Sequence, residues 1–177
     1  MTSHKDYLPM TPHSIRINYV LANDQDHYNA LKETGFWGKQ GAGCIVYARD
    51  ANMFLLAKRS RMVQEPGFWG IWGGAIDPNE DPKKAVLREL EEETEYKGPA
   101  RLKPLLVFTK GSFRYHNFVA IVPHAFKPEL NWESSNYMWC KHGEWPEPLH
   151  FGLVALFNDK ASIKILKELS DAGNDSK

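Results

Sequence analysis

The feature that most constrains this chain is a set of glycine and charged residues at fixed spacings within residues 74–96, which read GAIDPNEDPKKAVLRELEEETEY. Glu80 lies six residues after Gly74, and Arg88 lies eight residues after Glu80. The positions that complete the pattern are Glu89, Leu90, Glu92 and Glu93. Six of these positions demand one residue type each, and at roughly one in fifteen per position a chance match is well below about one in ten thousand. A merely solvated acidic helix face does not explain the pattern.

The residues around position 82 mark the start of a helix. Asp81 can accept hydrogen bonds from the free N–H groups of a first turn, and Pro82 lacks a donor that would be unsatisfied there. We expect the helix to run from Pro82 to Glu93 or to Tyr96.

The carboxylates of this helix share one face. At roughly 100° per residue, Glu89, Glu92 and Glu93 fall within one arc. Glu91 and Glu95 point elsewhere and are expected to be solvated. The residues of the neighbouring face, which can pack onto a sheet, are Val86, Leu87, Leu90 and Thr94.

A cation would explain why three carboxylates share a face. Like charges three and four residues apart destabilise a bare helix. Hard carboxylate oxygens suit Mg²⁺, with Mn²⁺ as a substitute. Because Mg²⁺ is typically held by one or two carboxylates plus substrate phosphates, the pattern predicts a site for a phosphorylated substrate.

With these residues the stretch resembles the Nudix box, and the chain resembles a MutT-like Nudix hydrolase. The resemblance implies an α/β fold, with a mixed β-sheet between helices in α/β/α layers. It also implies metal-dependent hydrolysis of a phosphoanhydride bond, by water attack at phosphorus, in a nucleoside diphosphate linked to another moiety. Arg88 resembles the family arginine that orients the glutamates by pairing with one of them. By resemblance the metal ligands are the Gly74 carbonyl, Glu89, Glu92 and Glu93.

The resemblance leaves the catalytic base open. Glu89 is one candidate, either as a ligand or as the base. Glu129 and Glu133 flank an expected strand in a late loop, and we prefer Glu133, although both can be ordinary surface acids. His116 and His150 are the two histidines of interest, and a structural role is favoured for each.

The chain departs from the family pattern at two places. The glycine usually found two residues after the last box glutamate is Glu95, and Tyr96 replaces the aliphatic residue that follows. A glycine there supplies a left-handed helix end, so its absence predicts a helix that continues or ends with strain. Gly98 can provide the stop instead. Trp72 stands where many relatives have proline.

Basic and aromatic side chains before the box are candidates for substrate binding. Lys58, Arg59 and Arg61 lie at the end of an expected strand and can contact phosphates. Strand ends also often carry solvated basic residues. Trp69 and Trp72 can stack on a nucleobase or cover the core.

Apolar patterns and turns predict the remaining elements. At 177 residues we expect a single Nudix domain, residues 1–177, with an N-terminal extension at about 1–40 and closing helices at about 151–170. The last residues, from 173, should fray. Strands are expected at residues 15–20, 41–48, 53–58, 101–109, 113–122 and 137–139, and helices at 24–34, 82–93, 151–158 and 160–170.

Charge and composition limit the partners. The 22 basic and 22 acidic residues give a net charge of zero, so no stable nucleic-acid complex or membrane attraction is expected. Cys44 and Cys140 form no CxxC pair, which favours two buried, reduced thiols. With a polar start and no apolar run of membrane-span length, we expect a cytoplasmic protein. The resemblance adds a nucleotide-type small-molecule substrate and a possible homodimer.

Two classes of function remain. One is the hydrolase, and the other is a catalytically inactive Nudix-fold module for nucleotide binding or regulation. Degenerate modules commonly lose box glutamates, whereas Glu89, Glu92 and Glu93 are all present here. The substrate stays open among ADP-ribose-like compounds, dinucleotides, nucleotide sugars and nucleoside triphosphates, because the fold alone does not choose among them.

Overall fold

A computed structural model describes residues 39–175 of the chain. The strands are β1 (Gln40–Ala48), β2 (Met53–Arg59), β3 (Trp69–Gly70), β4 (Trp72–Ala75), β5 (Arg101–Lys110), β6 (Phe113–Val122) and β7 (Ser134–Cys140). The helices are α2 (Pro82–Thr94), α3 (Phe151–Asn158) and α4 (Lys160–Asp175). None of these helices is both long and apolar enough to cross a membrane. The strand expected at residues 15–20 and the helix expected at 24–34 lie outside the described residues.

The strands form one mixed, seven-stranded sheet. Its main order is β3-β2-β1-β6-β5, with β4 pairing with β1 and β7 pairing with β2. β1 and β2 form an antiparallel hairpin, whereas β1 and β6 run parallel from the Gln40–Arg114 pair to the Ala48–Val122 pair. β1 therefore lies inside the sheet, with strands on both sides.

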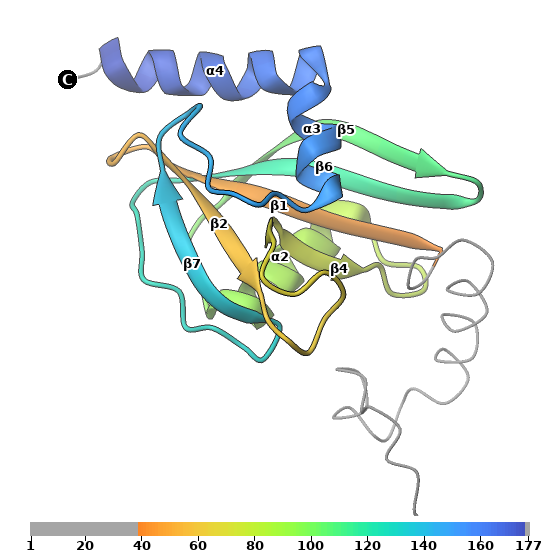
Figure 1. Cartoon of the computed structure of the whole chain (residues 1–177). Helices are drawn as coiled ribbons and strands as arrows, with labels where there is room; N and C mark the ends of the chain where they lie inside the picture. Colours follow the sequence, from red (N-terminus) through yellow and green to blue (C-terminus); the bar gives the residue numbers. More distant parts are fainter. Residues whose placement is uncertain (1–38, 176–177) are drawn as a thin grey trace, which may run out of the picture.

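The sheet separates two apolar cores. Because alternate residues of a strand point to opposite faces, Cys44 of β1 packs with Val86 and Leu90 of α2 on one face. On the other face Ile45 packs with leucines of α3 and α4, among them Leu156. Figure 1 shows α2 on one side of the sheet and α3 with α4 on the other. This arrangement confirms the α/β/α layers.

The C-terminal helix is longer than expected. Residues 173–175 belong to α4, so the expected fraying does not begin at residue 173. Asn52, in the β1–β2 turn, donates from Nδ2 to the Ser170 carbonyl at 3.0 Å and to Oδ1 of Asn174 at 2.8 Å. Its Oδ1 accepts from the Tyr47 hydroxyl at 2.9 Å. These bonds between distant parts of the chain hold the last turns of α4 on the sheet.

The box helix begins where the sequence predicts. Asp81 accepts a hydrogen bond from the Lys83 N–H at 2.9 Å, and Pro82 opens the helix. Leu87 is expected on the packing face but is 43% exposed, because it lies at the edge of that arc. The residues of the packing face that are buried are Val86, Leu90 and Thr94.

α2 ends with backbone strain. Glu95 is its C-cap, in the left-handed conformation with φ 56° and ψ 17°, and its N–H donates to the Glu91 carbonyl at 2.8 Å. That conformation costs a residue other than glycine roughly 1–2 kcal/mol. Of the outcomes that the sequence leaves open, the strained end is the one observed, and Gly98 is not the stop.

Replacing Glu95 with glycine is therefore expected to stabilise the fold. The gain should be about 0.5–1 kcal/mol, since relief of the left-handed strain exceeds the extra chain entropy of glycine. The thermal unfolding midpoint should rise by about 1–4 °C. Glu95→Ala is the control, because it removes the same charge but keeps a Cβ. An equal rise in both variants would assign the gain to the lost charge.

Three glycines let β1, β4 and β6 approach closely beside the box. A Cβ on Gly41 would lie 2.6 Å from the Tyr115 ring, and one on Gly43 would lie 2.4 Å from the Tyr115 hydroxyl. A Cβ on Gly73 would lie 2.3 Å from the Ala42 carbonyl oxygen and 2.7 Å from the same hydroxyl. The Tyr115 side chain therefore packs directly on glycine backbone, with its hydroxyl next to Gly73.

Candidate active site

Arg88 of α2 joins the acidic side chains around it. Its Nε and Nη2 donate to the two carboxylate oxygens of Glu80, each at 2.9 Å, and its Nη1 donates to Oε1 of Glu89 at 2.6 Å. Nη2 also donates to the Ala75 carbonyl at 3.1 Å, and Oε2 of Glu92 lies 3.6 Å from Nη1. These partners, Glu80 first, raise the pKa of Arg88. Arg88 thus ties α2 to the loop before it and is not an exposed surface arginine.

Glu93 is a buried carboxylate at the β4 side of the helix. It is 4% exposed, and its Oε1 accepts a hydrogen bond from the Gly73 N–H at 3.0 Å. Burial, followed by the charges of Glu133 and Glu89, raises its pKa well above the ordinary value, and the Gly73 hydrogen bond opposes the shift. Positive charge placed here would favour the ionised form.

Glu89 packs against the backbone of Gly74. A Cβ on Gly74 would lie 2.8 Å from Oε1 of Glu89, so only glycine lets β4 approach this carboxylate. Burial is the main cause of the raised pKa of Glu89, and the Arg88 charge opposes it. The structure thus brings Gly74, Glu89 and Glu93 together. Glu92, with its side chain 36% exposed, lies at the outer edge of this group.

Glu133 is the later carboxylate that approaches the box. Its pKa is raised to about 7, first by burial and then by the charge of Glu89, while the Arg59 charge opposes the shift. The backbone carbonyl of Glu133 accepts a hydrogen bond from the Ser60 N–H at 2.8 Å, which fixes the start of β7 beside the end of β2. Glu129, the other late candidate, has a side chain that is 63% exposed. Of these two late candidates, Glu133 is the half-buried one and Glu129 is exposed.

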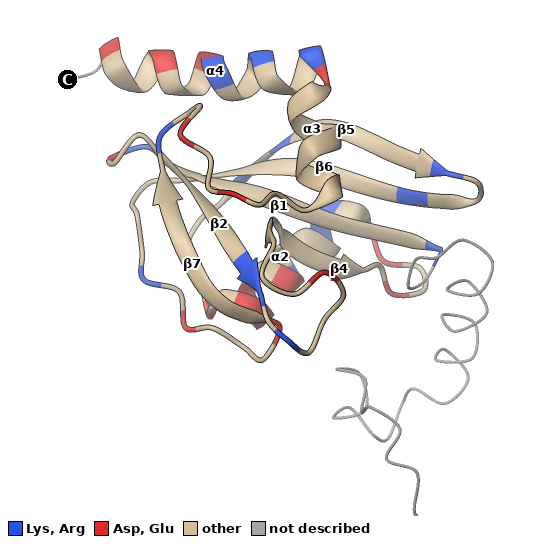
Figure 2. Ribbon diagram, viewed as in Figure 1, with Lys and Arg blue, Asp and Glu red and all other residues tan. Residues whose placement is uncertain are grey.

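Arg59 is the basic residue at the end of β2 that faces these carboxylates. Its charge acts on Glu133 and Glu93, lowering the pKa of each. Burial in turn lowers the pKa of Arg59 itself. Figure 2 shows the basic end of β2 against the acidic side of α2. Arg61 is exposed in the loop that follows, so of these two arginines the structure brings Arg59 to the site.

Trp69 and Trp72 belong to the apolar cores. Trp72 is fully buried, and its Nε1 donates to the Leu55 carbonyl at 3.4 Å. Trp69 is 5% exposed, and Nζ of Lys58 lies 5.6 Å from the centre of its ring. Stacking on a nucleobase needs an open ring face. The structure therefore corrects the expectation that these two rings bind substrate: they pack in the core, which is the alternative that the sequence allows.

The chemistry of these residues fits a hard divalent cation. Glu89, Glu93 and Glu133 are carboxylates whose pKa values burial and mutual repulsion raise, and Mg²⁺ prefers such oxygen donors. Within residues 39–175, no three acidic, histidine or cysteine side chains are arranged closely enough to hold a metal ion together. Arg88 accounts for this, since it holds Glu89 and lies next to Glu92. Arg88 contacts one oxygen of each side chain and is thereby placed to orient both toward a cation.

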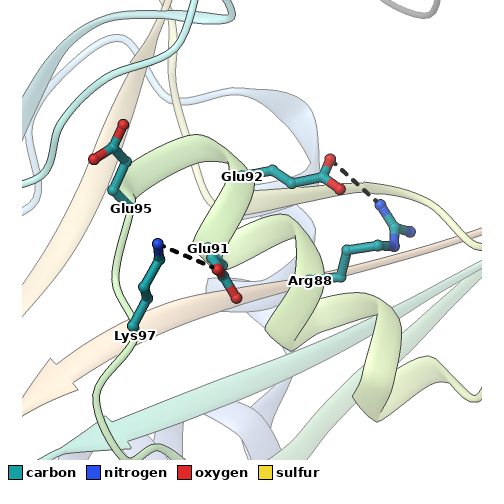
Figure 3. Close-up of a pocket in the computed structure, with 5 residues that line it drawn as sticks. All are labelled: Arg88, Glu91, Glu92, Glu95 and Lys97. Atoms are coloured by element: carbon teal, nitrogen blue, oxygen red, sulfur yellow. Dashed lines mark ion pairs between the residues drawn. The ribbon is translucent and has the colours of Figure 1, made fainter. Parts of the chain in front are cut away.

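An open cleft borders the outer side of α2, as Figure 3 shows. Glu92 turns toward Arg88 there, while Glu91 pairs with Lys97 at 3.8 Å. The side chain of Glu91 is 54% exposed, in agreement with its expected solvation. The lining residues are Arg88, Glu91, Glu92, Glu95 and Lys97. The cleft therefore gives solvent a route to Glu92.

The two histidines of interest have different settings. Nε2 of His116, on β6, has no hydrogen-bond partner within the described part of the chain. Nε2 of His150 lies 3.0 Å from Oε2 of Glu65, and its Nδ1 accepts a hydrogen bond from the Gly152 N–H at 3.2 Å. His150 thus caps α3 and contacts the loop that follows β2.

The stability of the fold should depend on His150 below neutral pH. Burial, and then the charge of Arg59, lowers its pKa from 6.5 to about 4. A histidine with a lowered folded-state pKa contributes stability that is complete above its unfolded pKa and is lost as the pH falls through the folded value. Between about pH 6.5 and 4.5 the unfolding midpoint of the wild type should fall more steeply than that of His150→Asn. Parallel curves would contradict the shifted pKa.

Sequence reasoning assigned no role to three residues of this region. Glu80 is the bidentate partner of Arg88, and its fixed position eight residues before Arg88 was the available signal. Tyr115 and Glu65 reach the site from β6 and from the loop after β2, and no local motif marks either residue.

Comparison with known proteins agrees with this geometry. The family model of the NUDIX domain matches residues 38–159, more than half of the chain. The chain is 37% identical over 68 residues to the CMP-5'-(N-acetyl-N-hydroxy-3-aminopropyl)phosphonate hydrolase of Streptomyces rubellomurinus, across 38% of this chain and 32% of that protein. It is 38% identical over 52 residues to the 8-oxo-dGTP diphosphatase of Proteus vulgaris, across 29% and 46%. The chain thus spans less than half the length of these two curated relatives.

Solved structures show the same fold. The crystal structure of RenU, a Nudix hydrolase from M. smegmatis, superposes with a TM-score of 0.64 at 23% identity, over 77% of this chain and 89% of that one. The match to the domain includes the whole box, from Gly74 to Glu93. This chain therefore belongs to the NUDIX domain family.

Proposed function

We propose that the protein is a Mg²⁺-dependent hydrolase that cleaves a phosphoanhydride bond in a nucleoside diphosphate linked to another moiety. The observation that carries this proposal is the group formed by the buried Glu89 and Glu93 and the half-buried Glu133, with Arg88 on one side and Arg59 on the other. Such a group is unfavourable by itself and becomes favourable when a cation and a phosphate join it. The relatives named above, a hydrolase and a diphosphatase, support the reaction class.

Four groups of this chain would hold the metal. They are the carboxylates of Glu89, Glu92 and Glu93 and the carbonyl of Gly74. When bound, the ion supplies charge neutralisation on the phosphate oxygens and a more acidic water; Mg²⁺ is proposed because every donor is oxygen, and Mn²⁺ can replace it.

We propose Glu133 as the base. A base must be ionised before it accepts the proton of the attacking water, and it is most effective when its pKa lies near the working pH. The pKa of Glu133 is raised to about 7, whereas Glu89 is already engaged by Arg88 at 2.6 Å. Arg59 then provides the positive charge that binds and orients a phosphate, because its guanidinium can donate to two oxygens at once.

We also propose that the protein is a single cytoplasmic domain. Cys44 and Cys140 are both buried free thiols, as expected for a protein in a reducing compartment. We propose a single domain with an N-terminal extension at about residues 1–40.

A panel of nucleotides tests the function. It should contain ADP-ribose, a dinucleotide, a nucleotide sugar, nucleoside triphosphates with 8-oxo-dGTP, and a CMP-linked phosphonate, each incubated with Mg²⁺ and analysed for products. We expect one class to be cleaved at a phosphoanhydride, and the products to show which bond breaks. Calorimetry should show Mg²⁺ binding. Binding of Mg²⁺ without turnover of any compound would reject the hydrolase in favour of an inactive module.

A further inference from the structure

His150 connects three elements beside the site. Its backbone N–H donates to the Trp69 carbonyl at 2.8 Å, which joins the start of α3 to β3. Its Nδ1 accepts from the Gly152 N–H at 3.2 Å, which caps α3. Its Nε2 lies 3.0 Å from Oε2 of Glu65, in the loop after β2. One imidazole ring thus links α3 to this loop.

The contacts of His150 define its protonation. Because Nδ1 accepts a hydrogen bond, it carries no proton, and Nε2 carries the N–H of the neutral ring. The lowered pKa of His150, about 4, agrees with a neutral ring. The protonated Nε2 lies 3.0 Å from Oε2 of Glu65, which is a polar contact between α3 and the loop after β2.

The loop after β2 folds tightly around Arg59. The Arg59 N–H donates to the Phe68 carbonyl and the Gly67 N–H donates to the Arg59 carbonyl, each at 2.9 Å. Nε of Arg59 donates to the Gln64 carbonyl at 2.5 Å. The carbonyl that holds the Arg59 side chain thus belongs to the residue before Glu65.

Glu65 is a strained position of this loop. Glu65 has a φ of 50°, in the left-handed region that is unfavourable for residues other than glycine. Its side chain is 40% exposed, and the contact with His150 ties it to the body of the fold. Without that contact the local strain at Glu65 favours another loop conformation, and the Gln64 carbonyl would move away from Arg59.

We propose that His150 is a positioning residue that, through its 3.0 Å contact with Glu65, holds the Gln64 carbonyl against Arg59 and so directs the Arg59 guanidinium at the substrate phosphate. The proposal rests on the proposed function, because it takes Arg59 as a phosphate contact. It gives α3 a part in substrate binding, although α3 lies on the opposite face of the sheet from the box helix.

Two variants remove the His150–Glu65 bond without removing the helix cap. Asparagine is a good N-cap residue but is too short to reach Glu65, so His150→Asn keeps the cap of α3 and loses the loop contact. Glu65→Ala loses the same contact from the other side. Glu65→Gln keeps an oxygen acceptor for Nε2–H and is the conservative control.

The first readout is the Arg59 side chain itself. In ¹⁵N NMR spectra of the full chain, the Arg59 Nε–H, bonded to the Gln64 carbonyl, should exchange slowly with water in the wild type and in Glu65→Gln. It should exchange at least about tenfold faster in His150→Asn and Glu65→Ala, because the bond that protects it opens. Unchanged exchange in both variants would overturn the proposal, whatever the protein hydrolyses.

The second readout is kinetic. On the substrate found in the nucleotide panel, His150→Asn and Glu65→Ala should each raise KM about tenfold and change kcat by less than about threefold, as expected for lost binding. Their double variant should be no worse than either one, because both remove the same bond. A fall in kcat at constant KM would overturn the positioning role. If the wild type cleaves nothing, the proposed function fails, and the exchange measurement still decides the role of His150.

Discussion

Replacing Glu93 with glutamine is expected to lower turnover by about 10²- to 10⁴-fold, or roughly 3–5 kcal/mol in activation free energy. Glutamine keeps an oxygen that can accept from the Gly73 N–H, which Oε1 of Glu93 does at 3.0 Å. It removes the negative charge that the proposed cation needs. Steady-state kinetics with Mg²⁺ measures the loss.

Stability measurements separate this loss from unfolding. The raised pKa of Glu93 means that its ionised form is unfavourable in the folded protein without metal. The metal-free Glu93→Gln variant should therefore unfold at a higher temperature than the wild type at pH 7, and Mg²⁺ should stabilise it less. Glu91→Gln is the matched control on the same helix, because Glu91 is exposed and paired with Lys97. Full activity in Glu93→Gln would remove Glu93 from the metal site.

The second large effect is expected for Arg88→Lys. Lysine keeps the charge but has no planar fork, so it cannot reproduce the two 2.9 Å bonds to Glu80 together with the 2.6 Å bond to Glu89. Residues that orient metal ligands typically contribute 10- to 100-fold to metal affinity or activity, and we expect a loss of about that size in kcat/KM. Mn²⁺ affinity, measured by electron paramagnetic resonance, should fall as well.

The control for Arg88→Lys is Arg101→Lys, on the exposed start of β5. This change should leave activity and Mn²⁺ affinity unaltered. A second comparison uses Glu80→Gln, which retains one hydrogen-bond acceptor for Arg88 and should give a smaller loss than Arg88→Lys. If Arg88→Lys binds Mn²⁺ and turns over substrate as the wild type does, the Arg88–Glu89 hydrogen bond has no role in orienting Glu89.

The start of the box helix could be read from the sequence because its causes are local. Asp81 and Pro82 act on the N–H groups of the next turn, so two adjacent residues decide where the helix begins. The end was harder to place. Glu95 takes a left-handed conformation that its residue type disfavours, and only the packing around it decides between a strained stop and a longer helix.

The surroundings of the site could not be read in this way. The contact between His150 and Glu65 joins residues far apart in the sequence, as does the approach of Glu133 to Glu89. Each depends on how strands pair and which loops meet. The burial of Trp72 has the same origin. An aromatic residue just before the box could face either solvent or the core, and because Trp72 pairs with Cys44 in the sheet its side chain lies in the core.

The packing of Tyr115 on Gly41 and Gly43 also limits how this site can evolve. A side chain at Gly41 would collide with the tyrosine ring, so this position can accept a larger residue only after residue 115 becomes smaller. The reverse order would pass through a clashing intermediate. A Cβ at Gly43 would also lie 2.6 Å from the Trp72 carbonyl oxygen, so a smaller residue 115 would not by itself make room there. Mutations at Gly41 should therefore be contingent on an earlier change of the aromatic residue on β6, whereas Gly43 is constrained by the backbone of β4 as well.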